Sequence, residues 1–247
     1  MKVLKVQNYF KDKQWIYSLI GSVCLWLVIG ILTSRLNVQS LISNATSASF
    51  LAIAALGQMF VVSCGRGSID LSIPGVITLT AFLSTGIIDG SNANLFHAFL
   101  ICLAVGTAVG FINSISVLFL KIPPLIATLA MGYILGTAAL VYNESFNTFK
   151  TCPILTVISK GKILGIPWII ILTVIIAALA WFLLNRTTYG RCLTAVGQNI
   201  KAAHLSGINT NKTQLVAYVI SGIFAAFAGI LIATRVSGAF LGMGDTY

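Results

Sequence analysis

Residues that could carry out catalysis or hold a metal are few in this sequence, and they are not grouped. The chain has two histidines, His97 and His204, which are far apart, and it contains no HExxH or GxSxG motif. Its five cysteines are scattered without CxxC spacing, and an odd number fits neither a disulfide framework nor a zinc site. The sequence therefore predicts no catalytic residue, no metal site and no cofactor in this chain.

The polar residues that could meet a solute lie within or beside long apolar stretches. Polar groups in such stretches are costly in lipid unless they face other helices or a polar cavity. We predict a substrate pathway lined by Gln58, Asp70, Asn113, Thr128 and Tyr218. Each of these side chains could instead bond a neighbouring helix, and Asp70 could simply cap the helix that follows it. Both interpretations stay open at this point.

The elements that must position these residues are membrane-spanning helices. Only 8% of the residues are charged and 57% are hydrophobic, whereas soluble proteins carry about 25% charged residues. Charged residues bound seven uncharged runs, each able to hold one helix across the hydrocarbon layer: 14–34, 36–65, 71–88, 90–120, 122–143, 163–185 and 213–234. Runs such as Trp168–Leu184 are continuously apolar, which argues against a β-barrel. We predict an all-α integral membrane protein, a polytopic helical bundle with about seven spans.

The distribution of basic residues predicts the orientation of the bundle. With seven alternating spans, the lysines before the first span and the basic residues between the sixth and seventh lie on one side, which the positive-inside rule makes cytoplasmic. These residues are Lys2, Lys5, Lys11, Lys13, Arg186, Arg191, Lys201 and Lys212. The N-terminus is thus predicted to be cytoplasmic, and the net charge of +10 is attributed to topology rather than to a nucleic-acid partner.

The predicted domain organisation follows from these spans. Residues 1–13 form a cytoplasmic tail and residues 14–247 form the membrane domain, with a polar cytoplasmic loop at 185–213. No segment is large enough for a soluble domain, so an ATPase or solute-capturing activity must belong to another polypeptide. Two GxxxG pairs, Gly106/Gly110 and Gly132/Gly136, suggest close helix packing.

The loop at 185–213 has the pattern of a short surface helix. Leu193, Val196, Ile200 and Ala203 recur with helical spacing on one face. The helix has no aromatic residue on that face, unlike helices that rest on lipid headgroups. Small residues would let it enter a groove of a protein partner, although a plain interfacial helix remains the alternative.

Four ordered stretches resemble a known family. Gly190–Ile208, with the letters GRCLTAVGQNIKAAHLSGI, closely resembles the cytoplasmic coupling loop of ribose-type sugar ABC transporter permeases, a family that includes autoinducer-2 permeases. Ser68–Ser72 resembles its G-x-I-D-L-S element, and Asn113 with Lys121–Leu129 resembles its N…K-I-P-P-F-I-A-T-L element. Ser221–Arg235 resembles its S-G…A-G-I…R segment. Together these cover roughly residues 57–247.

The resemblance implies an importer core in the bacterial cytoplasmic (inner) membrane, without catalysis of its own. A second permease subunit, two ABC ATPase subunits and a periplasmic sugar-binding protein would be its partners, besides membrane lipid. The chain lacks the Walker A pattern, so ATP would be hydrolysed by the partner. The residues implied to contact the ATPase are Gly190, Arg191, Ala195, Gly197, Asn199, Ala202, Ala203 and Gly207.

Two features depart from the family pattern. The turn before Asp70 reads Gly-Arg-Gly-Ser, where many members have a second glycine beside the isoleucine. Members typically continue with Glu-Leu and further spans after the position of Tyr247, so we expect a C-terminally truncated permease domain.

Two other functions compete with the importer. An ion-coupled secondary transporter of a small polar solute would place charged residues within its spans, whereas all five acidic residues are expected at span ends or in loops. These residues are Asp12, Asp70, Asp89, Glu144 and Asp245. A membrane enzyme would need the catalytic motifs that the sequence lacks.

Overall fold

The computed structural model describes residues 15–33, 37–65, 67–145, 150–163 and 165–246. The predicted tail at 1–13 lies outside these residues. The chain forms two compact units, Met1–Ala45 and Thr46–Tyr247. The first unit contains α2 (Trp15–Leu32) and the first two turns of α3 (Val38–Val62). All the predicted site residues belong to the second unit.

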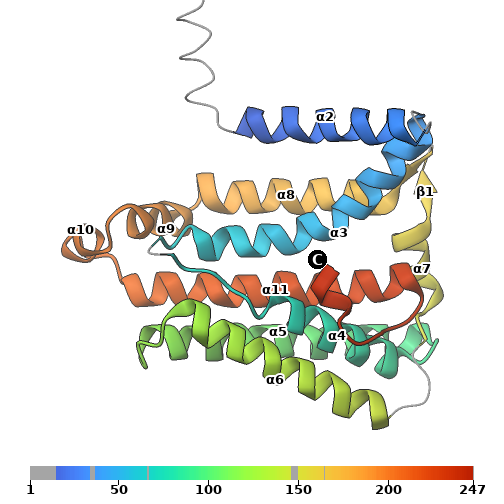
Figure 1. The fold of residues 1–247 in the computed structure, drawn as a ribbon. Coiled ribbons are helices and arrows are strands. Elements are labelled where there is room, and N and C mark those ends of the chain that lie inside the picture. The colour runs from blue at the N-terminus through green and yellow to red at the C-terminus, as the bar shows by residue number, and fades with distance from the viewer. Residues whose placement is uncertain (1–14, 34–36, 66, 146–149, 164, 247) are drawn as a thin grey trace, which may run out of the picture. The chain divides into compact units, whose positions relative to one another are not determined.

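The second unit is built almost entirely from helices (Figure 1). After the rest of α3, its elements are α4 (Ile73–Ile88), η1 (Asn92–Asn94), α5 (Leu95–Leu118), α6 (Pro124–Ser145), α7 (Pro153–Lys160), β1 (Lys162–Ile163), β2 (Ile166–Pro167), α8 (Trp168–Arg186), α9 (Thr188–Gln198), α10 (Ile200–Leu205), α11 (Thr210–Val236) and η2 (Met243–Thr246). The two short strands pair antiparallel, with Lys162 opposite Pro167, and form a hairpin before α8.

Each of the seven predicted runs contains one apolar helix. Five described helices are long and apolar enough to cross a membrane, and two apolar helices are shorter, at Ile16–Leu32 and Ile73–Ile88. The prediction of an all-α membrane protein with about seven spans is thereby confirmed. The cytoplasmic placement of the N-terminus stays a prediction.

α4 is the shortest of the seven described apolar helices. α4 has 16 residues, which at 1.5 Å per residue extend ~24 Å, whereas the hydrocarbon layer is about 30 Å thick. The described residues that lead into it, 63–65 and 67–72, are irregular and turn at Gly65 and Gly67, whose φ angles are +72° and +69°. We call these described residues the pre-α4 segment. Part of the third apolar stretch is therefore non-helical backbone.

α11 lies at the centre of the second unit and packs closely on α5, which runs beside it in Figure 1. A Cβ atom added to Gly106 would overlap the carbonyl oxygen of Gly222, and one added to Gly110 would overlap that of Tyr218. The first GxxxG pair is thus confirmed as a helix-packing site. In the second pair Gly132 lies against α4 near Gly75, but Gly136 faces open space.

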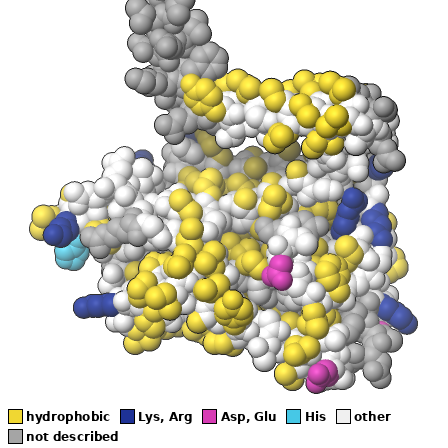
Figure 2. All heavy atoms as spheres, in the orientation of Figure 1, with side chains coloured by type: hydrophobic (Ala, Val, Ile, Leu, Met, Phe, Trp, Pro, Cys, Tyr) yellow, Lys and Arg dark blue, Asp and Glu magenta, His cyan; other side chains and the backbone are white. Residues whose placement is uncertain are grey.

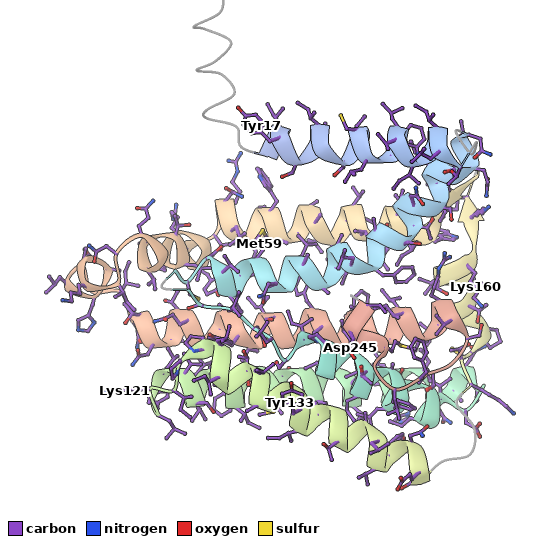
Figure 3. The ribbon with its side chains drawn as sticks, viewed as in Figure 1. Tyr17, Met59, Lys121, Tyr133, Lys160 and Asp245 are labelled. Atoms are coloured by element: carbon purple, nitrogen blue, oxygen red, sulfur yellow. The ribbon has the colours of Figure 1, made fainter. Side chains whose placement is uncertain are left out.

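The surface of the second unit is largely apolar on the face drawn in Figure 2, where hydrophobic side chains cover much of the flank over α6. The exposed large hydrophobic residues of α6 include Leu125, Ile126, Tyr133 and Ile134. Asp245 lies near the middle of the same face (Figure 3). Lys121 and Lys160 lie at opposite ends of the unit, with Tyr133 between them (Figure 3). This arrangement suits helices that cross lipid from end to end.

The α5–α11 contact leads to a stability prediction. Gly222→Ala inserts a methyl group into the backbone of Gly106, so the helices must separate, and we expect a loss of about 1–3 kcal/mol in the free energy of unfolding. Gly136→Ala is the matched control, because its methyl group meets nothing within 4 Å. Thermal unfolding in detergent measures both, and equal midpoints for the two variants would contradict the packing account.

Candidate functional site

The pre-α4 segment must find hydrogen-bond partners within the protein. Lipid offers none to a backbone N–H, so non-helical backbone is tolerated at membrane depth only where protein or a water-filled cavity supplies partners. The segment leaves α3 in a tight turn, in which the Gly65 N–H donates to the Val62 oxygen at 3.1 Å. A second turn follows, with the Ser68 N–H donating to the Gly65 oxygen at 3.0 Å.

Side chains from two flanking helices accept the next two backbone amides. The Asp70 N–H donates to Oε1 of Gln58, on α3, at 3.2 Å. The Leu71 N–H donates to Oγ1 of Thr128, on α6, at 3.0 Å. Thr128 is fully buried and donates its own hydroxyl proton to the Pro124 oxygen at 2.8 Å. Gln58 and Thr128 thus take the place of the helical partners that this backbone lacks.

The Asp70 carboxylate is the centre of the arrangement. Asp70 is only 3% exposed. Its Oδ1 accepts from the Ser72 N–H at 3.0 Å, from Ser72 Oγ at 2.6 Å and from Asn113 Nδ2 at 3.5 Å. Its Oδ2 accepts from Ser221 Oγ at 2.8 Å. Asn113 Nδ2 also donates to Ser72 Oγ at 2.8 Å. The network therefore joins the pre-α4 segment to α5 and α11.

These contacts show whether Asp70 caps the helix that follows it. The N-cap residue of α4 is Ser72, and its side chain makes no capping bond. Asp70 bonds Ser72, two residues along the chain, and also reaches two other helices. It is therefore a brace for the irregular backbone rather than a helix cap.

Four of the five predicted pathway residues meet around this segment, namely Gln58, Asp70, Asn113 and Thr128. The fifth, Tyr218, is 1% exposed on α11. Its hydroxyl makes no hydrogen bond of ordinary geometry to a described residue.

Sequence reasoning missed two members of the network, Ser72 and Ser221. Both lie in stretches that resemble the permease family, but nothing in their spacing shows that they meet. The expectation that every acidic residue sits at a span end or in a loop also needs correction. Asp70 precedes α4, yet the bundle encloses it, because the chain enters the protein interior before the helix begins.

The predicted surface helix at 185–213 consists of two helices. α9 ends and α10 begins at Asn199, whose backbone is extended. Its Oδ1 accepts from the N–H groups of Lys201 and Ala202, both at 3.1 Å. An asparagine that caps the second helix in this way interrupts the first. The stretch that the sequence predicts as one helix therefore forms two helices, with a break at Asn199.

The apolar face of this loop packs against its own bundle. Leu193 is fully buried in a cluster with Phe60, Cys64 and Ala217. Tyr189 joins the same cluster, and its hydroxyl donates to the Thr213 oxygen at 3.4 Å. The apolar residues with helical spacing thus face the membrane domain and hold the loop on it. A partner would meet the opposite face of the loop.

The eight residues predicted to contact an ATPase divide between the two faces. Arg191, Asn199, Ala202 and Gly207 are exposed, whereas Gly190 and Ala203 are buried and Ala195 and Gly197 are half-buried. Leu205 was not predicted from the sequence, although its side chain is 87% exposed at the end of α10.

Comparison with known proteins shows the family of this chain. A model of the family described as the permease component of the branched-chain amino acid transport system matches residues 40–247. The ribose import permease protein RbsC of Haemophilus influenzae is 31% identical over 215 residues, which cover 85% of this chain and 66% of that protein. The chain belongs to this permease family.

Other permeases show similar likeness. The galactofuranose transporter permease protein YtfT of Escherichia coli is 35% identical over 190 residues, covering 76% of this chain and 54% of that protein. The autoinducer 2 import system permease protein LsrC of Salmonella typhi is 32% identical over 232 residues, covering 93% and 65%. No solved structure gives a significant match. The chain spans about half to two thirds of the length of these permeases.

Family membership confirms the resemblance seen in the sequence. The chain is a permease component and a multi-pass membrane protein of the kind that bacteria place in the inner membrane, and the relatives named above are permeases for ribose, galactofuranose and autoinducer 2.

Thr128 offers a clean test of the site. Thr128→Val keeps the branched shape of the threonine side chain but removes the hydroxyl oxygen that accepts the Leu71 N–H. We expect a loss of about 1–3 kcal/mol in the free energy of unfolding, the usual result of leaving one buried donor unpaired. Thr128→Ser is the control, because it retains the hydroxyl. If valine and serine variants unfold at the same denaturant concentration, Thr128 does not hold the segment.

Proposed function

We propose that this chain is the membrane-spanning subunit of an ABC importer that moves a simple, ribose-like sugar across the bacterial inner membrane. The observation that carries the proposal is family membership over residues 40–247, together with a coupling loop that is anchored to the bundle on one face and free on the other. ABC ATPase subunits, a second permease subunit and an external sugar-binding protein complete the proposed assembly. ATP is hydrolysed by the ATPase.

The proposed pathway runs beside the pre-α4 segment. Gln58, Asn113 and Thr128 bring polar groups into the bundle at this place, and Tyr218 adds a buried hydroxyl. A neutral sugar needs only transient hydrogen bonds during passage, with different contacts in two states of the bundle. The polar groups around Asp70 supply such contacts when the segment moves.

For docking, the exposed side of α9 and α10 is the proposed contact with the ATPase. Arg191, Asn199, Ala202 and Gly207 lie there together with Leu205. Gly190, Gly197 and Ala203 face the permease itself and contribute by letting the loop lie close to the bundle. In particular, a Cβ on Gly190 would overlap the oxygen of Leu184, so this glycine permits the corner between α8 and α9.

An ion-coupled transporter is the second candidate, and the buried Asp70 is the observation in its favour. The geometry of the carboxylate argues for the importer instead. Oδ1 already accepts from Ser72 and Asn113 and Oδ2 accepts from Ser221, so a bound cation would have to displace these donors or share the one lone pair left on Oδ2.

Co-purification tests the importer. The full-length permease is expressed with the ABC ATPase encoded nearest to it, and both are extracted in detergent. We expect Ala202→Trp to abolish retention of the ATPase, because Ala202 is exposed on α10 and a bulky ring blocks close approach. Ala93→Trp is the matched control, since Ala93 is exposed in η1, outside the coupling loop.

The outcomes of this experiment distinguish the ABC importer from the ion-coupled secondary transporter. Retention of the ATPase by the wild type and by Ala93→Trp, with loss in Ala202→Trp, supports the importer. A folded wild type that retains no ATPase, and that takes up D-ribose only with an ion gradient, would favour the secondary transporter. Gly197→Trp is unsuitable for this purpose, because it would disrupt the permease's own packing at Ser63.

A further inference from the structure

We propose that the contact between Gly197 on the coupling loop and Gly65 in the pre-α4 segment transmits ATPase-driven movement to the Asp70 network. The two glycines would thus be positioning residues for transport. This inference rests on the proposed importer function and specifies where, within the permease, the coupling loop acts.

The contact joins two backbones with no side chain between them. A Cβ added to Gly65 would lie 2.5 Å from the carbonyl oxygen of Gly197 and 3.1 Å from its Cα. A Cβ added to Gly197 would overlap the carbonyl oxygen of Ser63 and lie 3.3 Å from the carbonyl carbon of the same residue. Contacts this close transmit displacement directly, because neither side has a rotamer that can yield.

Gly65 is also directly connected to the polar network. Its carbonyl oxygen accepts from the Ser68 N–H at 3.0 Å, and Ser68 is buried two residues before Asp70. The Asp70 and Leu71 amides are then held by Gln58 and Thr128. A shift of Gly65 must therefore move this stretch of backbone or break these hydrogen bonds.

The other contacts of α9 differ in kind. Leu193 and Tyr189 attach α9 to an apolar cluster that includes α3, α8, α11 and Cys64 of the pre-α4 segment, and apolar side chains can repack when a helix shifts. Those contacts keep the loop on the bundle, whereas the Gly197–Gly65 contact meets the same segment through backbone atoms alone. This division explains why glycine stands at 197, on the half-buried side of a helix where alanine would favour helix formation.

The test adds one methyl group on either side of the contact. Gly197→Ala adds a Cβ to a helical residue, and Gly65→Ala adds one at a positive φ angle. Gly67→Ala is the matched control for backbone strain, since its φ is +69° and its Cβ would meet nothing within 4 Å. The full-length permease is reconstituted in liposomes with its ATPase and sugar-binding protein. Retention of the ATPase and the stimulation of ATP hydrolysis by D-ribose are measured.

We expect Gly197→Ala and Gly65→Ala to retain the ATPase but to lose stimulation by at least about fivefold, the lower end of typical coupling between sites. Gly67→Ala should keep more of the stimulation than Gly65→Ala. Wild-type stimulation in Gly197→Ala would overturn the inference and leave the importer intact. A wild type that retains no ATPase would instead overturn the importer, and the inference with it.

A second measurement covers the case in which the variants do not fold. Hydrogen exchange of residues 67–72 is followed in the wild-type complex, with and without a non-hydrolysable ATP analogue. Exchange at Ser68–Leu71 should change when the analogue binds. Unchanged exchange there, in a complex whose α9 and α10 do respond, would overturn the inference.

Discussion

Backbone amides in a membrane must find their partners within the protein, and this permease meets that requirement at one irregular place. The chain leaves α3 at Val62, and the described residues between there and Ile73 are not helical. Between these points, Gln58 and Thr128 accept backbone protons and the Asp70 carboxylate gathers donors from the segment, α5 and α11. Without them, buried donors would stay unpaired in a low-dielectric interior, where each costs about 1–3 kcal/mol.

The close packing of the helices allows this network to form. Ser221 and Asn113 reach Asp70 because α5 and α11 approach to backbone contact at Gly106, Gly110 and Gly222. α6 approaches α4 in the same way at Gly75 and Gly132, which places Thr128 beside Leu71. Small residues thus do two things here. They gain packing contacts between helices that lipid would otherwise separate, and they bring short polar side chains within hydrogen-bonding distance.

The same segment lies between the proposed pathway and the proposed docking surface. The coupling loop is fastened to the bundle by Leu193 and Tyr189, and it touches the start of the pre-α4 segment at Gly65. The proposed pathway and the proposed docking surface are therefore linked by a few residues of irregular backbone. The backbone amides of this segment bond to side chains, which can be exchanged for other acceptors, whereas the amides of a continuous helix bond to fixed backbone carbonyls. Such a segment suits a protein that changes between two states.

The fold was largely predictable because charges are expensive in lipid. The uncharged runs located every span. Polar residues in apolar stretches identified most of the Asp70 network. The contributions of Ser72 and Ser221 were not predictable, because serine is small enough to sit in any helix and its partner lies far away in the sequence.

The coupling loop was predictable in part. Its periodicity was recognised, but a repeating apolar face does not say whether the face meets lipid, a partner or the chain itself. Leu193 and Val196 turn out to be buried against the chain's own bundle. The break at Asn199 depends on its side chain reaching the amides of Lys201 and Ala202, which competes with helix continuation in a way that spacing alone does not reveal.

The most direct test of the account is a double-mutant cycle on Asp70 and Ser221 in the full-length permease. Asp70→Ala, Ser221→Ala and the double variant are unfolded by SDS in mixed micelles, and the free energies of unfolding are compared. If the carboxylate braces the pre-α4 segment against α11, the two substitutions are coupled by between about 0.6 and 3 kcal/mol. Additive losses would show that the two side chains do not stabilise each other, and the account of the network would be wrong.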